Sequence, residues 1–158
     1  ASQQGFQPVF SVVSFTGVSE LAKLLPSGSQ VLASMVMPDP QHSKLTLVNV
    51  YRQQLAANKQ RQSITQQPTL PVSMRLSDVS LEGFAAATVF VGALKQCAAS
   101  LTRSCVLQAL PQQSLFDFPL QYDTKRHQAS QQVQLVWLKN QSLEPVGDSA
   151  VKVDTIND

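Results

Sequence analysis

Charged residues are scarce in this chain: they make up 14% of its 158 residues, and the formal net charge is only +2. Hydrophobic residues make up 43%, which excludes a disordered chain, because such chains combine few apolar residues with a high net charge. Lys and Arg are scattered, with only Lys125 and Arg126 adjacent, so the basic patch of a nucleic-acid-binding protein is missing and no nucleic-acid partner is expected. The apolar run at 85–94 is too short for a membrane-spanning helix, which needs roughly 18 residues.

A targeting segment is also missing. Residues 1–5 are small and polar, and no apolar stretch with a basic flank follows them. We therefore expect either a mature product whose signal peptide has been removed or a part that begins inside a longer protein. A length of 158 residues suits one domain with one core. Glutamine makes up about 13% of the sequence, so amides as well as charges supply solubility.

The motifs of catalysis are missing as well. No Gly-rich phosphate loop, no Gly-x-Ser-x-Gly elbow and no His-Glu-x-x-His pair occurs. His42 and His127 lie in polar loops, where a solvated histidine is more common than a base or a ligand. Asp117 and Asp123 flank an expected strand at 118–122 and would lie about 20 Å apart, too far for an acid–base pair. We therefore expect no enzyme activity, no metal and no cofactor.

Apolar periodicity and turn residues predict a chain that alternates strands and helices before it ends in a hairpin. The expected elements are strands at 9–15, 30–37, 118–122, 132–138 and 143–146, helices at 18–25, 45–59, 78–95 and 102–110, and a Gln/Pro-rich surface loop at 60–77. Either Ser77 or Asp78 can cap the helix that runs to Lys95. This order indicates an α/β fold with a short antiparallel addition.

The two cysteines lie at neighbouring helix ends. Cys97 follows one expected helix and Cys105 lies in the first turn of the next, so a reversal between them would bring the thiols within bridging distance. No histidine lies near them to complete a tetrahedral metal site. The alternatives are a disulfide, which we favour and which implies an oxidising compartment, and two buried, inert thiols.

One segment resembles a known family. Residues 80–84 read Ser-Leu-Glu-Gly-Phe, an Ala-rich helix follows them to Ala93-Leu94, and Leu101-Thr102-Arg103 opens the next helix. This run resembles the C-terminal half of the type I periplasmic solute-binding proteins, the Leu/Ile/Val-binding-protein-like receptors of ABC importers. Further segments that are similar to the family's motifs, in the family's order, lie at 13–17, 36–40, 50–51 and 118–120 with 127–130. Together the motifs span nearly the whole chain.

The resemblance implies two Rossmann-like α/β lobes that are joined by a three-stranded hinge and close on a ligand, as in a Venus flytrap. It implies that residues 1–116 are the C-terminal part of lobe 1 and that 117–148 are hinge-crossing antiparallel strands and a hairpin, which lead toward the second lobe. Residues 149–158 would be a flexible tail, and 121–123 would belong to the hinge. The chain would then be about half of a receptor, obtained as a fragment or completed by a separate chain.

The function that the resemblance implies is capture of a small polar solute, an amino acid or a related compound, outside the cytoplasm. The implied partners are the ligand, a membrane-embedded ABC permease, and the N-terminal half of the same receptor, which would supply Ser and Thr contacts to the ligand. A sensory input domain with the same fold is the alternative. A small α/β enzyme is the third hypothesis, and the lack of a nucleophile–base pair argues against it.

Ligands of open α/β sheets bind beyond the carboxyl ends of the strands. The residues expected at that edge are Ser14, Phe15 and Thr16, and those expected on the same rim at the start of the long helix are Asp78, Ser80 and Glu82. Asp78 stands where family members often have an aromatic residue, and an acid there would favour a cationic or hydroxylated ligand. The structural alternatives are an N-cap for Asp78 and a favourable helix-dipole interaction for Glu82.

Overall fold

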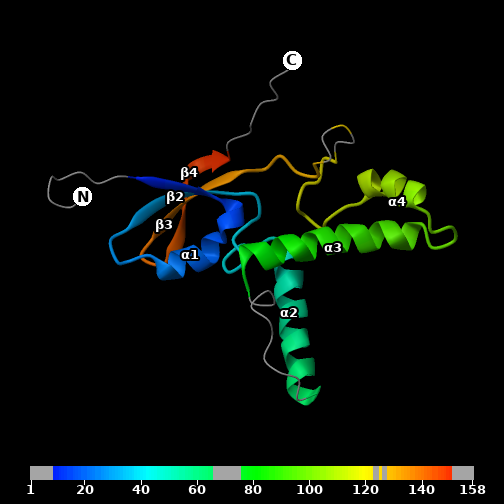
Figure 1. The fold of residues 1–158 in the computed structure, drawn as a ribbon, viewed down its shortest axis with the longest axis horizontal. Coiled ribbons are helices and arrows are strands. Elements are labelled where there is room, and N and C mark those ends of the chain that lie inside the picture. Colours follow the sequence, from blue (N-terminus) through cyan, green and yellow to red (C-terminus); the bar gives the residue numbers. More distant parts are fainter. Residues whose placement is uncertain (1–8, 66–75, 123–124, 126–127, 151–158) are drawn as a thin grey trace. The chain divides into compact units, whose positions relative to one another are not determined.

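The computed structural model describes residues 9–65, 76–122, 125 and 128–150, with the backbone alone described at 62–65 and 147–150. The chain divides into two units (Figure 1). Unit 1 combines the residues up to Met37 with those from Gln132 onward, and unit 2 contains Pro38–Gln131. Each unit is built from different elements and is described by itself.

Unit 1 contains one four-stranded sheet. Its strands are β1 (Phe10–Val13), β2 (Gln30–Met35), β3 (Gln134–Lys139) and β4 (Ser142–Ala150), and they lie side by side in that order. The pair β1–β2 is parallel, whereas β2–β3 and β3–β4 are antiparallel. The middle of the sheet therefore joins two segments that are separated by about 100 residues in the sequence.

Helix α1 (Val18–Leu24) covers one face of this sheet and connects its two parallel strands. Gly17 precedes the helix with φ 71°, a left-handed conformation that glycine adopts without steric cost. The core between helix and sheet consists of Val18, Ala22, Val31, Ala33, Met35, Val136 and Leu138. The alternation of buried and less buried residues along β2 follows the two-residue period of a strand.

The β3–β4 hairpin turns at Asn140 and Gln141. Both residues have positive φ, 48° and 63°, as a two-residue turn of the primed type requires. The sequence predicts this turn and its two strands, although β4 extends further than 143–146.

Unit 2 is helical. It contains α2 (Thr46–Thr65), α3 (Asp78–Gln96), α4 (Arg103–Ala109) and the short 3₁₀ helix η4 (Leu110–Gln112). The first turns of α2 and α3 meet, and the rest of α2 extends away from α3 (Figure 1). Their contact is made by Tyr51, whose ring lies 5.6 Å from that of Phe84, centroid to centroid. None of the helices in the described ranges has the length and hydropathy to cross a bilayer.

The α/β class expected from the sequence is confirmed, but several boundaries differ. The strand expected at 118–122 is wrong: Phe118 forms only an isolated bridge with Leu115, and Pro119 has no N–H to continue a ladder. Helix α2 extends to Thr65, through residues 60–65, because no Gly or Pro interrupts that stretch. The rest of the expected loop, 66–75, and residues 151–158 of the expected tail lie outside the described residues.

The limits of the two units also differ from the expected divisions after residues 116 and 148. The chain leaves unit 1 after Met37 and returns at Gln132. The reason is the antiparallel pairing of β3 with β2, which places the last third of the chain in the same sheet as its first third. The assignment of these residues to the lobes of a receptor stays a prediction.

Candidate functional site

The residues expected at the edge of the sheet form a single turn. Ser14, Phe15 and Thr16 make up the 3₁₀ helix η2, directly after β1. The Thr16 hydroxyl donates to the Val13 carbonyl at 2.8 Å, so its only proton is used and it can serve a ligand as an acceptor. The Phe15 side chain is 85% exposed in the described structure, a large apolar surface next to two hydroxyl groups.

The other expected residues lie at the start of α3, in unit 2, where Ser77 is the N-cap. Its hydroxyl accepts from the Ser80 N–H at 3.2 Å, and the Ser77 N–H donates to the Ser80 hydroxyl at 3.3 Å, which is a reciprocal capping box. The Ser80 hydroxyl also bonds the Tyr51 hydroxyl. Ser80 is therefore already engaged in fixing the helix start and its contact with α2.

The two carboxylates in these turns differ in exposure. Asp78 is only 4% exposed, whereas Glu82 is exposed to solvent. Of the two residues considered for the N-cap, Ser77 fills the position, and Asp78 is the first residue within the helix. Both carboxylates lie near the positive end of the helix dipole. The six expected ligand residues thus form two groups of three, one in each unit, and their binding role stays a prediction.

Replacing Ser77 by Ala should destabilise α3. Loss of an N-cap hydroxyl costs about 1 kcal/mol, and we expect the Tm of the 158-residue chain to fall by about 2–4 °C in thermal unfolding followed by circular dichroism. Ser100→Ala is the matched control, because Ser100 is exposed and its backbone N–H donates to Cys97. Equal melting of both variants would contradict the capping assignment.

Asp117 has a role that the sequence does not reveal. Its carboxylate accepts from the backbone N–H groups of Thr46 at 2.7 Å and Leu47 at 3.2 Å, and so caps α2 from 70 residues away. The bond from Thr46 holds the pKa of the Asp117 carboxyl below its ordinary value of 3.8, although partial loss of solvent contact acts in the opposite direction. A cap supplied from such a distance leaves no local pattern in the sequence.

The lowered pKa of Asp117 predicts a pH dependence. A carboxyl group with a depressed folded-state pKa stabilises the fold fully above its unfolded value, 3.8, and this contribution is lost as the pH falls through the lower folded value. We expect the amide proton resonance of Thr46 to shift upfield between about pH 6 and about pH 2, with a midpoint below 3.8. Asp117→Asn should abolish this shift in an NMR titration. A midpoint above 3.8 would contradict the cap.

The histidines supply no acid–base site in the part of the chain that is described. His42 is exposed, and its Nδ1 lies 2.8 Å from Oδ2 of Asp39, three residues before it. His127 and Asp123 lie outside the described residues. Among those described, no group of three or more His, Cys, Asp and Glu side chains is arranged to hold a metal ion.

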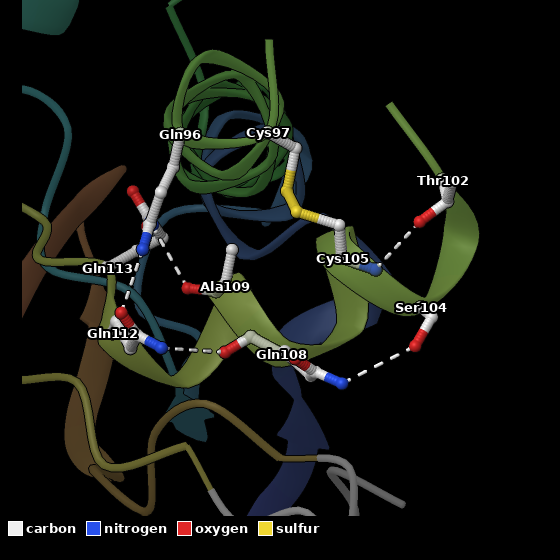
Figure 2. Close-up of a disulfide and its surroundings, with 9 residues drawn as sticks. All are labelled: Gln96, Cys97, Thr102, Ser104, Cys105, Gln108, Ala109, Gln112 and Gln113. Atoms are coloured by element: carbon white, nitrogen blue, oxygen red, sulfur yellow. Dashed lines mark hydrogen bonds between the residues drawn. A yellow bond between two sulfur atoms is a disulfide. The ribbon is translucent and has the colours of Figure 1, made fainter. Parts of the chain in front are cut away.

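The cysteines lie at the end of α3 and in the first turn of α4. A disulfide joins Cys97 to Cys105, whose Cα atoms are 6.0 Å apart (Figure 2). Thr102 caps α4 by accepting the Cys105 N–H at 3.2 Å, so the cap fixes the backbone beside one of the bridged residues. Helix α4 thereby begins at a fixed distance from the end of α3.

Glutamine side-chain amides join α3 to η4, the short helix that follows α4 (Figure 2). Gln96 on α3 donates to Gln112 and accepts from Gln113, both at 2.8 Å, and Gln113 also donates to the Ala109 carbonyl at 3.0 Å. Part of the glutamine excess thus has a structural use, because these amides cross between α3 and η4. The sequence alone indicates only polar surface here.

Comparison with known proteins tests the resemblance to solute-binding proteins. No protein-family model matches the sequence, and no curated protein matches it. A solved structure of a possible leucine/isoleucine/valine-binding protein from Rhodopirellula baltica SH 1 is 30% identical, superimposes with a TM-score of 0.65 and covers 92% of this chain. The resemblance to type I periplasmic solute-binding proteins is thus confirmed.

The chain spans 37% of the length of that binding protein. This share agrees with the C-terminal part of a solute-binding protein that the motifs indicate. The fold therefore resembles a portion of that possible binding protein, with β1, α1 and β2 in one unit and the Ser-Leu-Glu-Gly-Phe helix, α3, in the other.

Proposed function

We propose that this chain is part of an extracytoplasmic solute-binding receptor that captures a small polar ligand, an amino acid or a related compound, for an ABC importer. The observation that carries the proposal is the 30% identity to a possible leucine/isoleucine/valine-binding protein over 92% of this chain. That neighbour is a possible leucine/isoleucine/valine-binding protein, which supports a binding role for this chain more than a catalytic one. The disulfide supports a location outside the cytoplasm, because such bonds persist in oxidising compartments.

The two units support an assignment to the two lobes of such a receptor. Unit 1 is an α/β layer and unit 2 a set of helices, and the chain passes between them twice, after Met37 and before Gln132. We propose that each unit contributes to a different lobe and that the two passages belong to the hinge. This assignment differs from the division after residue 116, because β3 pairs with β2 and not with an element of unit 2.

An apolar surface on α3 supports the presence of a further part of the receptor. Val79, Phe90 and Val91 are each between 44% and 54% exposed, and the only charged residues of α3 are Asp78, Glu82 and Lys95. A helix that is apolar on most of its surface is normally buried on more than one side. We propose that the exposed apolar side of α3 is covered by another portion of the receptor, outside the part that this chain matches.

Each unit has its own proposed ligand residues. On unit 1 the Ser14 and Thr16 hydroxyls and the Phe15 ring follow the carboxyl end of a parallel strand, the edge at which α/β proteins bind ligands. On unit 2 the buried Asp78 would provide a negative charge. Either kind of acceptor, a hydroxyl or a carboxylate, suits the ammonium group of an amino acid or a hydroxylated solute.

The test is calorimetric titration of the complete natural protein that contains this chain with leucine, serine, glutamine and arginine. Saturable binding of at least one of them, with the solute recovered unchanged, is expected. Absence of binding to all four, or conversion of the solute, would contradict a receptor for amino acids.

Replacing Asp78 by Asn should weaken binding of the preferred amino acid by about tenfold, since a charge-assisted hydrogen bond would be exchanged for a neutral one. The Ser77 cap is left in place, so the start of α3 should persist. Glu144→Gln is the control, because it removes an exposed carboxylate from β4. If Asp78→Asn and the control bind equally well, Asp78 is not a ligand residue.

A further inference from the structure

The first two turns of α2 hold both of the segments that connect the units. The outgoing segment, residues 38–45, follows the passage at Met37. Arg52, in the second turn of α2, donates from Nε to the carbonyl of Pro40 at 2.8 Å. Pro40 is fully buried, so this bond fixes a rigid residue of the connector against the helix.

The outgoing segment has a second link to the same turns. Nη1 of Arg52 donates to Oδ1 of Asn49 at 3.2 Å, and the amide of Asn49 donates to the Lys44 carbonyl at 3.3 Å. The arginine and the asparagine thus bind the connector at both of its ends, at Pro40 and at Lys44. Within residues 38–45, Asp39 organises the turn by accepting the backbone N–H of Gln41 at 2.6 Å.

The return segment, which leads from η4 toward the passage before Gln132, includes residues 115–121 and bonds to the same helix through Asp117. Leu115 and Phe118 are buried and form an isolated bridge. Between them Phe116 has φ 51°, a left-handed conformation that costs a bulky residue free energy. This bend places Asp117 so that its carboxylate caps Thr46 and Leu47 at the start of α2.

The helix segment itself is firmly packed. Leu47, Val48 and Tyr51 are all at most 3% exposed, and the Tyr51 hydroxyl accepts the N–H of Ser77 at 3.3 Å. The segment from Thr46 to Arg52 therefore combines a rigid packing face with hydrogen bonds to both connectors.

We propose that the first two turns of α2 couple the two connectors, with Arg52 and Asp117 as positioning residues, so that loosening one connector loosens the other. The inference rests on the proposed function, in which lobes open and close around a ligand through such connectors. If the two connectors are coupled, both should change conformation together when the lobes open or close. The bonds that carry the inference lie within unit 2.

Hydrogen–deuterium exchange of the intact protein, read by mass spectrometry without any ligand, tests the coupling. Asp117→Ala should raise exchange directly at 46–48 and, by coupling, at 38–45, by about fivefold in each case. In the reciprocal experiment Arg52→Gln should raise exchange at 115–121 by a similar factor. Asp117→Asn keeps one carbonyl acceptor and should give a smaller increase, which covers the case in which the alanine variant does not fold.

Thr102→Ala is the matched control, because it removes the side-chain cap of another helix of unit 2. It should leave exchange at 38–45 and 115–121 unchanged. The coupling is overturned if each connector variant acts only on its own connector, or if Thr102→Ala loosens both connectors as much as Asp117→Ala does. The exchange experiment uses no ligand, so its result does not depend on amino-acid binding. Coupled exchange in a protein that binds no amino acid would refute the proposed function and leave the coupling supported.

Discussion

Leu138→Ala is expected to lower the free energy of unfolding of unit 1 by about 3 kcal/mol, because truncating a buried leucine removes its burial and leaves a cavity. Leu138 is 0% exposed and lies on β3, opposite Val31 of β2 and Leu143 of β4. It therefore contributes to the contact between the first and last thirds of the chain. A loss of this size corresponds to a fall in Tm of about 6–12 °C.

The single tryptophan makes this prediction specific to one unit. Trp137 lies beside Leu138 on β3, 5.1 Å below the ammonium group of Lys139, so its fluorescence reports the sheet and not the helices. Gln134→Ala on the same strand is the control, since Gln134 is exposed. If the fluorescence transition of Leu138→Ala shifts no more than that of Gln134→Ala, the sheet is not the core of unit 1.

Local patterns predict most helices and strands of this fold but not their partners, and the strand expected at 118–122 is an exception. The run at 9–15, the glycine at 17 and the leucines after it specify a strand, a turn and a helix from neighbouring residues alone. The pairing of β2 with β3 is different, because it depends on two apolar strands that meet across about 100 residues. The division into units follows from this pairing, which explains why it differs from the divisions expected after residues 116 and 148.

The candidate site shows the same limit. The capping box joins Ser77 and Ser80, which are only three positions apart, and the sequence indicates either Ser77 or Asp78 as the cap. The bond from Ser80 to Tyr51 and the cap that Asp117 supplies to α2 connect residues 29 and 71 positions apart. Such bonds depend on tertiary packing, so the residues next to Asp117 in the sequence predict only that it lies at the end of a strand.

Removing the disulfide should destabilise unit 2 by about 2.5 kcal/mol, the chain-entropy value for a loop of this length. Cys97 and Cys105 are 8 residues apart, and the bridge restricts the unfolded chain over that span. We expect the Tm of the double variant, Cys97→Ala with Cys105→Ala, to fall by about 5–10 °C. Alanine is preferred to serine at residue 97, because Cys97 is 2% exposed and a hydroxyl there would be buried.

A reducing agent provides the internal control for this prediction. It should lower the Tm of the parent protein toward that of the double variant and leave the double variant unchanged. The amide bonds of Gln96 with Gln112 and Gln113 remain in both proteins and hold α3 to η4 by themselves. A fall in Tm of less than about 2 °C on reduction would therefore mean that these amides, and not the disulfide, fix α4 to α3. The bridge would then add little to folding stability.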